Sequence, residues 1–596
     1  MSRQRLALLF SLLLAALLWF GLGPAFRRVK VPVPHVLAVV LDPYDNPILA
    51  DYGRYRDALL ANDLPALEDL ARSSEGYLQL RTLFTLARHD GLGAADRLRY
   101  LKQAMALRIH DPLARAETQA LWLERAHLAE AAGLPQEAVS AYREALPDQE
   151  AADALRRLVT DPYDLSNFFL QARMYAEALK VLGDLSAPSI EAPAYRALGE
   201  YDQALDAYQR WLDEFPDSSE ARSGRAWTLF YLGRAEEADA AFAALPGPDA
   251  LYGRGILARR AGEIDRAVRF FCDTGQASRL WYATDLLEAE GRAADAIPIY
   301  LELARGGTDY ADDAAFRALV LAKRQGEAEL AARARALLSA ESYLGLVAGE
   351  TLALPTTSTL PRVEPPVLEL AGALVRLHDP EAAIGELEFA LRDAEDEATT
   401  VAIAEALQAM GEFRQSQRAA EAWIDAGSRD LRTWRLAYPR AYPQLVEDAA
   451  ARWDITPSLV WAVMRQESRF YPGAVSRTGA KGLMQFMPST WDWMAELLNE
   501  PPGDPFSPGD NIRYGARYLS WLMNYFDGDI ERAVPSYNGG QGYIGRLFEA
   551  PPVSGDKTEF YRFIDKTETR DFLQKVMYNY RVYQELYGGQ LAEGAR

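Results

Sequence analysis

The stretch GEYDQALDAYQRWLDEFP, residues 199–216, has the pattern of a helix framed by a glycine and a proline. Ala204 and Tyr208 are four residues apart, so a small and a large side chain share one helical face, against which a neighbouring helix can pack closely. Gly199 suits a tight turn between antiparallel helices, because glycine adopts a left-handed backbone at little cost. The stretch therefore predicts a helical hairpin whose apolar face needs a partner.

The same pattern recurs between about residues 130 and 300. Residues 199–216 resemble a tetratricopeptide repeat, while the other copies are degenerate. One such unit cannot bury its own apolar face, so we expect the copies to stack into an α-solenoid. In each copy a glycine stands five residues before the alanine, and the pairs are Ala138/Tyr142, Ala204/Tyr208, Ala238/Phe242, Ala267/Phe271 and Ala296/Tyr300, after Gly133, Gly199, Gly233, Gly262 and Gly291.

The composition is that of an ordered, mostly soluble protein, with 49% hydrophobic and 25% charged residues. A chain of 596 residues is too long for one core. We expect an all-α protein with a leader at 1–30, a tetratricopeptide-like superhelix at 31–351, a linker with four prolines at 352–366, further helices at 367–445 and a catalytic domain at 446–590. The net charge of -21 argues against a nucleic-acid partner.

An uncharged, leucine-rich run at residues 6–26 lies between Arg3 and Arg5 and the basic residues 27–30. Its length is enough to cross a bilayer as a helix. A secretory signal peptide has a shorter apolar run and a small-x-small cleavage site, and the nearest candidate here would place Pro24 first in the mature chain. We therefore favour an uncleaved membrane anchor over a cleaved signal. Both place the rest of the chain outside the cytoplasm, in the cell envelope.

The last third of the chain has few options for chemistry. No histidine follows His378, and the only cysteine is Cys272, so Ser-His-Asp, Cys-His and histidine-zinc sites are excluded there. Between residues 450 and 596, 16 Lys and Arg stand against 18 Asp and Glu, so most of the net charge lies earlier in the chain. Carboxylates, hydroxyls, amides and lysines remain, and we expect neither a metal nor a cofactor.

Glu467 stands out near the end of a predicted helix with Thr456 as its N-cap. It follows Val463 by four residues and Met464 by three, so it projects from the apolar face. Burial and the negative end of the helix both disfavour the carboxylate and should raise its pKa, as a general acid requires. The alternative is that Glu467 turns to solvent at a frayed helix end.

Four motifs follow in order: ESRFYPGAVSRTGAKGLMQFMPST at 467–490, DPFSPGDNIRYGARYL at 504–519, SYNGG at 536–540 and TETRDFLQKV at 567–576. Together they resemble the soluble lytic transglycosylases of family 1, whose catalytic domain is mostly helical and similar to goose lysozyme. A helical superhelix often precedes that domain in the family. The resemblance implies peptidoglycan as the substrate, cut at the β-1,4 bond between N-acetylmuramic acid and N-acetylglucosamine with formation of a 1,6-anhydromuramyl end.

The resemblance also implies the site residues. It makes Glu467 the acid and later the base, and it makes Ser476, Gln485, Met487, Tyr537 and Glu568 substrate-binding residues. Each has a structural alternative: Gln485 could tie a loop to the backbone, Met487 could fill a core and Glu568 could be an ordinary first-turn acid. Pro535 and Ser536, where alanines are common, and Phe572, where tyrosine is frequent, depart from the family pattern.

Two other functions fit the same sequence. One is a hydrolase of the goose-lysozyme type, which would need a second carboxylate or water-activating group. The other is a non-catalytic scaffold whose last domain only grips glycan. In every case the expected partners are peptidoglycan strands, envelope proteins that bind the repeats and, through an uncleaved leader, the cytoplasmic membrane.

Overall fold

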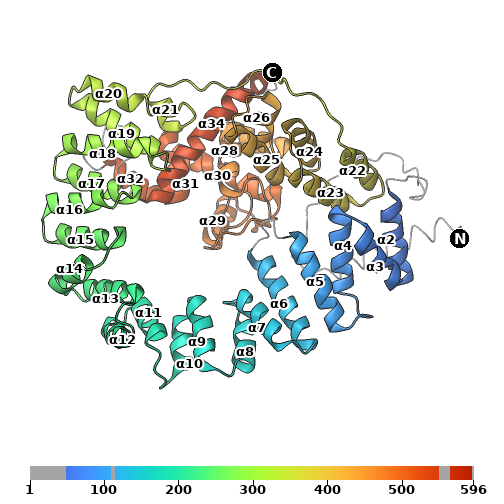
Figure 1. Ribbon diagram of the computed structural model, residues 1–596. Coiled ribbons are helices and arrows are strands. Elements are labelled where there is room, and N and C mark those ends of the chain that lie inside the picture. Colours follow the sequence, from blue (N-terminus) through green and yellow to red (C-terminus); the bar gives the residue numbers. More distant parts are fainter. Residues whose placement is uncertain (1–48, 109–114, 550–563, 565, 594–596) are drawn as a thin grey trace. The chain divides into compact units, whose positions relative to one another are not determined.

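The computed structural model describes residues 49–108, 115–549, 564 and 566–593, so the predicted leader lies outside the described residues. The described chain is helical (Figure 1) and, in place of strands, has two isolated β-bridges that join Val475 and Phe486 to Lys481. None of the described helices is both long and apolar enough to span a membrane. The all-α prediction is confirmed.

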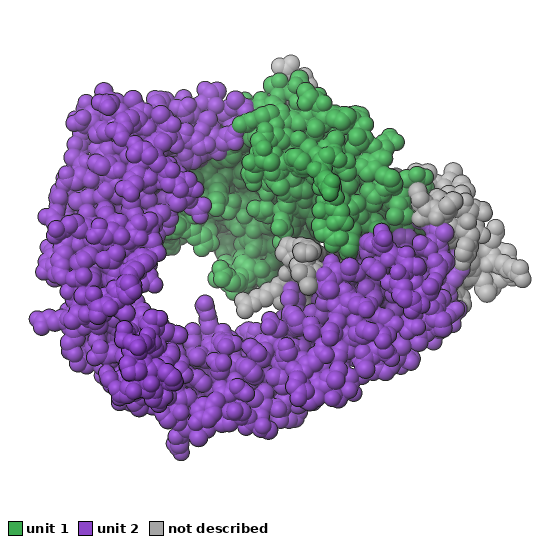
Figure 2. Space-filling model, in the orientation of Figure 1, with its two compact units in different colours: residues 1–41, 354–551, 564–596 green, residues 42–353, 552–563 purple. Residues whose placement is uncertain are grey.

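The chain divides into two compact units, coloured separately in Figure 2. The first along the sequence, purple in Figure 2, lies within residues 42–353, and the second, green in Figure 2, lies within residues 354–551 and 564–596. In the first unit, which we call the array, neighbouring helices pack on one another along the sequence. Its helices are α2 (Ala50–Ala61), α3 (Leu64–Ser73), α4 (Gly76–Ala87), α5 (Ala94–Arg108), α6 (Arg115–Ala131), α7 (Pro135–Ala145), α8 (Gln149–Leu158), α9 (Pro162–Gln171), α10 (Tyr175–Leu182), α11 (Pro188–Leu198), α12 (Tyr201–Glu214), α13 (Ser219–Tyr231), α14 (Ala235–Ala243), α15 (Pro248–Arg260), α16 (Ile264–Asp273), α17 (Ala277–Ala289), α18 (Ala293–Arg305), α19 (Ala311–Arg324), α20 (Ala328–Arg335) and α21 (Tyr343–Val347).

The repeated pairs are the core of the array. All five alanines and their aromatic partners are buried, and all five preceding glycines have a positive φ, as the turn required. The structure adds a contact that the pairs alone did not predict. The ring of Tyr208 fills the space where Gly224 of the next helix has no side chain, since a Cβ there would lie 2.2 Å from Tyr208 Cζ. Phe242 meets Gly253 of the next helix in the same way, and Phe271 meets Gly255 of the preceding helix.

The second unit begins with an extended segment and continues through twelve helices within the described residues. Asp430, at the start of α26, accepts hydrogen bonds from Ser358, Thr359 and Leu360 of that segment. The helices are α22 (Pro366–Arg376), α23 (Pro380–Arg392), α24 (Glu397–Ala409), α25 (Phe413–Asp425), α26 (Leu431–Ala437), α27 (Pro443–Trp453), α28 (Pro457–Ser468), α29 (Pro488–Leu498), α30 (Pro508–Tyr525), α31 (Ile530–Gly539), α32 (Gln541–Glu549) and α34 (Thr567–Glu593).

Helix α28 lies at the centre of the second unit and packs on α34. Trp461 of α28 is fully buried, stacks on Tyr583 of α34 and donates a hydrogen bond of 2.8 Å to the carbonyl of Ala441. One turn later, Arg465 pairs with Glu421 of α25 and donates to Asn579 of α34. These contacts fix the axial position of α28 and therefore the position of the residues at its end.

Candidate active site

Glu467 is the last but one residue of α28 and is half-buried. The residues from Leu459 to Met464 are all buried, so Glu467 lies at the end of a helix that is packed in the core. Thr456 occupies the N-cap position but its side chain does not cap the helix, because its hydroxyl faces Tyr580 Oη at 3.4 Å. The helix is thus held by packing and by Pro457 in its first turn rather than by a side-chain cap.

Burial, followed by the negative charge of Glu568, raises the pKa of Glu467 to about 8. Among the residues that the structure describes, the Glu467 carboxyl has neither an ion pair nor a recorded hydrogen bond that would stabilise its charged form. A carboxyl group in this environment keeps its proton at neutral pH. The direction agrees with the sequence-based expectation, while the second cause is Glu568 and not the end of the helix.

Tyr537 of α31 lies within electrostatic reach of this acid. Its hydroxyl donates a 2.8 Å hydrogen bond to the carbonyl of Met484, and both burial and the charge of Glu467 raise its pKa well above the ordinary value. The phenol is therefore neutral and can act only as a hydrogen-bond donor and acceptor. Phe572 stacks on its ring at 6.1 Å with an interplanar angle of 8°, so this departure from the family pattern is a packing residue.

The GLMQ loop, residues 482–485, lies between the acid helix and α30. Ser468, next to Glu467, donates a 2.7 Å hydrogen bond to the carbonyl of Leu483. From the other side, the buried Asn511 accepts a 2.8 Å bond from the amide of Met484. Gly515 leaves room for the Met484 side chain, because a Cβ there would lie 1.9 Å from Sδ. The loop is thus fixed at both edges beside Glu467.

Asn511 and Gly515 belong to the motif at 504–519, but the sequence did not predict their role. Asn511 also donates to the carbonyl of Pro505 at 2.8 Å, which closes a small network around the loop. An asparagine and a glycine four residues apart on one face of a long helix are a signal for such a docking position. The role of Arg465 was not predicted either, because its partners Glu421 and Asn579 are distant in the sequence and only the tertiary fold brings them together.

The three remaining loop residues have different environments. Ser476 accepts a hydrogen bond from the amide of Ala480 at 2.9 Å and lies 3.0 Å from the Thr478 hydroxyl. The Gln485 amide donates to the carbonyls of Ala474 and Gly482, and this residue has a left-handed φ of 49°. Gln485 thus ties the loop that contains Ser476 to the GLMQ loop, which is the alternative role named above.

Met487 is 41% exposed at the start of α29, whereas Met484 is buried.

Glu568 lies in the first turn of α34 and is exposed. Asn538 donates to its carboxylate at 3.4 Å and accepts a 2.7 Å hydrogen bond from Thr569, so the SYNGG and TETR motifs are joined. The charge of Glu568 reaches Glu467, as the pKa of that group shows. The structure therefore places Tyr537 and Glu568 within electrostatic reach of Glu467 and joins Tyr537 to the GLMQ loop. The side chain of Ser476 bonds only within its own loop, and Met487 is exposed.

Two family comparisons agree with this arrangement. Residues 444–559 match the Transglycosylase SLT domain, and residues 195–259 match the Tetratricopeptide repeat. The chain therefore has a transglycosylase SLT domain that follows tetratricopeptide repeats, as the motifs predicted.

Individual relatives cover different parts of the chain. The membrane-bound lytic murein transglycosylase C of Yersinia pestis (strain Pestoides F) is 37% identical over 145 residues, which are 22% of this chain and 39% of that protein. The chain thus spans about 39% of the length of the curated relatives it matches. The structure of the 70-kDa soluble lytic transglycosylase in complex with bulgecin A is similar in fold, with a TM-score of 0.52 and 18% identity over 91% of this chain and 92% of that one.

Proposed function

We propose that this protein is a lytic transglycosylase that cleaves peptidoglycan at the β-1,4 bond between N-acetylmuramic acid and N-acetylglucosamine. The observation that carries the proposal is the half-buried Glu467 in the SLT domain, whose pKa is raised to about 8. At neutral pH this group holds a proton next to a neutral tyrosine and a fixed loop. That is the state in which a carboxyl group can act as a general acid.

In the first step Glu467 donates its proton to the glycosidic oxygen, and the bond between that oxygen and the muramyl C1 breaks. Positive charge develops on the muramyl ring, and the acetamido oxygen of the same sugar stabilises it. Tyr537, held by the carbonyl of Met484, stands beside the acid and orients the reacting sugar. Ser476, Gln485 and Met487 line the groove in this proposal, and Glu568 meets the peptide stem.

In the second step the ionised Glu467 takes the proton of the muramyl 6-hydroxyl. The oxygen attacks C1 and closes the 1,6-anhydro ring, so no water enters the products. The carboxyl group regains the proton that it gave, and the same residue is ready for another turn. Burial favours this return, because the charged form of Glu467 is disfavoured throughout the cycle.

A hydrolase is the second candidate, and one observation favours it. Glu568 lies close enough to raise the pKa of Glu467, so a second carboxylate is within electrostatic reach of the acid. In a two-carboxylate mechanism Glu568 would activate a water molecule or stabilise the muramyl cation. Its exposure and its bond to Asn538 suit the peptide-stem role better, since an exposed carboxylate is fully hydrated.

Product analysis tests the proposal directly. Purified sacculi are digested with the protein, and the released muropeptides are measured by mass spectrometry, with the Glu467→Gln variant as the control. Anhydromuropeptides that are absent from the control are the expected result. Products that are heavier by one water molecule, with free reducing ends, would establish the hydrolase instead.

The remaining assignments are part of the same proposal. Residues 446–590 carry the reaction, residues 31–351 form the superhelix, 352–366 the linker and 367–445 a helical connection. The activity requires the protein to act outside the cytoplasm in the cell envelope, where the leader at 1–30 would hold it to the membrane. Its partners are glycan strands and envelope proteins that bind the repeats, and nucleic acid is not among them.

A further inference from the structure

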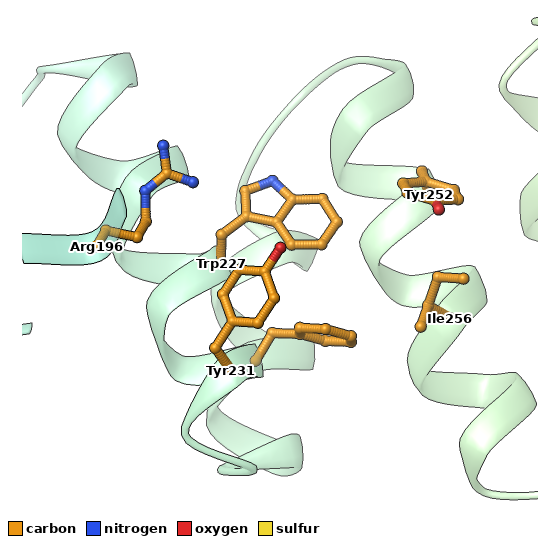
Figure 3. Close-up of a pocket in the computed structure, with 6 residues that line it drawn as sticks. Arg196, Trp227, Tyr231, Tyr252 and Ile256 are labelled. Atoms are coloured by element: carbon orange, nitrogen blue, oxygen red, sulfur yellow. The ribbon is translucent and has the colours of Figure 1, made fainter. Parts of the chain in front are cut away.

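An aromatic pocket of about 280 Å³ lies in the array, far along the sequence from Glu467. In Figure 3, Trp227 and Tyr231 of α13 lie opposite Tyr252 and Ile256 of α15, and Arg196 of α11 lies beside Trp227. Phe230 completes the lining. Tyr231 is 51% exposed, which is unusual for a ring that could pack in the core. These rings therefore form a concave aromatic surface open to solvent.

The rings continue beyond the pocket in both directions. Tyr231 stacks on Tyr201 of α12 with centroids 5.1 Å apart and an interplanar angle of 12°. On the other side, Tyr252 contacts Tyr282 of α17 at 6.1 Å, and Tyr282 is 40% exposed. Helices α12, α13, α15 and α17 thus present neighbouring tyrosines. Flat rings with polar edges suit the faces of sugar rings, which carry both C–H groups and hydroxyls.

One arginine, Arg196, lines the pocket, and two others lie over rings that line it. The guanidinium of Arg279 lies 3.4 Å from the ring centroid of Tyr252, and that of Arg260 lies 4.1 Å from the centroid of Phe230. Arg196 forms a side-chain hydrogen bond with the phenol of Tyr208, which is neutral because burial raises its pKa. Within the described chain no carboxylate forms an ion pair with any of the three, and the Nε atoms of Arg196 and Arg279 are buried without a hydrogen-bond partner. The pocket is thus a cationic site in a protein of net charge -21.

Nearby arginines differ in this respect. Arg254 on the same helix α15 pairs with Asp239 at 2.9 Å, and Arg266 on α16 pairs with Glu263 and Asp239. These two neighbours thus have carboxylate partners, whereas the three arginines at the pocket have none within the described chain. A guanidinium that has no carboxylate partner in its own chain can bind one from a ligand strongly, because the bonds are charge-assisted and can be bidentate.

We propose that this pocket binds one muramyl-peptide unit of peptidoglycan, with the sugar on the aromatic rings and the carboxylates of its lactyl-peptide stem on Arg196 and Arg279. The proposal rests on the proposed function for the substrate class and adds a second binding site for it. A pocket of about 280 Å³ accommodates one sugar ring of this unit, and the peptide stem extends from it along the arginines. A site in the array would hold the glycan strand while Glu467 cuts elsewhere along it.

Hydrogen exchange measured by mass spectrometry tests the site in the whole chain. The Glu467→Gln variant prevents turnover, and the probe is the soluble disaccharide tetrapeptide N-acetylglucosaminyl-N-acetylmuramyl-tetrapeptide. We expect protection of peptides from α13 and α15 as well as from α28 and the GLMQ loop. Chitotetraose, which has sugar rings and no carboxylate, should protect α13 and α15 at least tenfold less effectively. Protection restricted to the SLT domain, or equal protection by chitotetraose, would overturn the proposal.

Variants at the pocket sharpen the result. In the same background, Arg196→Gln combined with Arg279→Gln should weaken the protection of α13 and α15 by at least tenfold, and Tyr231→Ala should weaken it less. Arg259→Gln, an exposed residue of α15, and Tyr163→Ala, an exposed tyrosine of α9, are the matched controls and should change nothing. Equal binding by pocket and control variants would refute the arginine assignment. Anhydromuropeptide release by the unsubstituted chain is measured in parallel. Release without protection of α13 and α15 would refute the pocket proposal alone, whereas absence of release would refute the proposed activity.

Discussion

The array and the SLT domain treat buried acids in opposite ways. In the array, the side chain of Glu288 is almost completely buried, forms an ion pair with the guanidinium of Arg317 and accepts a hydrogen bond from the hydroxyl of Tyr300. In the SLT domain, Glu467 is half-buried, has no recorded cationic partner in the described chain and has a pKa raised to about 8. A paired acid stays ionised and stabilises packing only through its partner. An isolated acid stays protonated, and this makes it available for chemistry.

The two regions also use the same packing device for different ends. In the array, Tyr208 fills the space at Gly224, and the device recurs in later repeats. In the SLT domain, Met484 fills the space at Gly515, and the device occurs once, where it sets the position of a loop beside the acid. Repetition gives the array its regular stack, while a single use gives the SLT domain one defined site.

The largest expected effect comes from removing the isolated acid. Glu467→Gln should lower turnover of purified sacculi by more than about 100-fold, the usual scale for loss of a general acid. Release of soluble muropeptides over time measures this. A variant that restores the function of the wild type in cells would favour the non-catalytic scaffold, and Asp239→Asn in the array is the matched control, with turnover unchanged.

Gly515→Ala should cost about 1–3 kcal/mol of stability, because the added methyl group cannot fit against Met484 without displacing the GLMQ loop. Turnover should fall together with stability. Gly224→Ala places the same methyl group against Tyr208 and should destabilise the array by a similar amount, with turnover of a small soluble muropeptide preserved. Thermal unfolding measures stability, and muropeptide release measures turnover. Equal loss of turnover in both variants would contradict the prediction that only the SLT-domain glycine positions the active-site loop.

The raised pKa of Glu467 predicts two dependences on pH. Turnover should fall above about pH 8, where the acid loses its proton. In the unfolded chain the same group ionises near pH 4.3, so between these values the folded state holds more protons and its stability falls as pH rises. Glu467→Gln should therefore raise the free energy of unfolding by about 2–4 kcal/mol at pH 8 and by little at pH 4. Equal unfolding curves for the two proteins at pH 8 would contradict the burial of the group.

Glu568→Gln removes the like charge that reaches Glu467. The pKa of Glu467 should fall, since one of its two causes is lost, and the alkaline limit of turnover should move down by less than about one pH unit because burial remains the larger cause. Turnover should fall less than about tenfold, and the products should stay anhydro. A loss as large as that of Glu467→Gln, together with hydrated wild-type products, would instead make Glu568 the second carboxylate of a hydrolase.

The smallest effect is expected at a surface pair in the array. Asp239→Asn breaks the ion pairs with Arg254 and Arg266, all partly exposed, and should change stability by less than about 1 kcal/mol. Chemical denaturation in low and high salt measures this. A change of several kcal/mol would mean that the array, like the SLT domain, depends on single charged groups.

Much of the fold was predictable because it is written in local periodicity. The alanine and aromatic pairs at a spacing of four, and the glycines before them, predicted the hairpins. In the structure the pairs are buried and the glycines have a positive φ, as expected. The glycines that receive the rings were not predicted, because each lies on a neighbouring helix and no local pattern connects it to its ring. The leader and the roles of the site residues remain predictions.

By itself, the sequence determined that the array is helical, that four motifs follow in order, and that Glu467 leaves α28 on its buried face, because helical periodicity is a property of neighbouring residues. Only the tertiary structure decided that Glu568, about a hundred residues later, lies within electrostatic reach of that acid, and that Tyr537 bonds the carbonyl of Met484. Only it left three arginines around an aromatic pocket without carboxylates. Pairing and burial depend on residues that are distant in the chain, and these decide which groups keep a proton and which are free to bind.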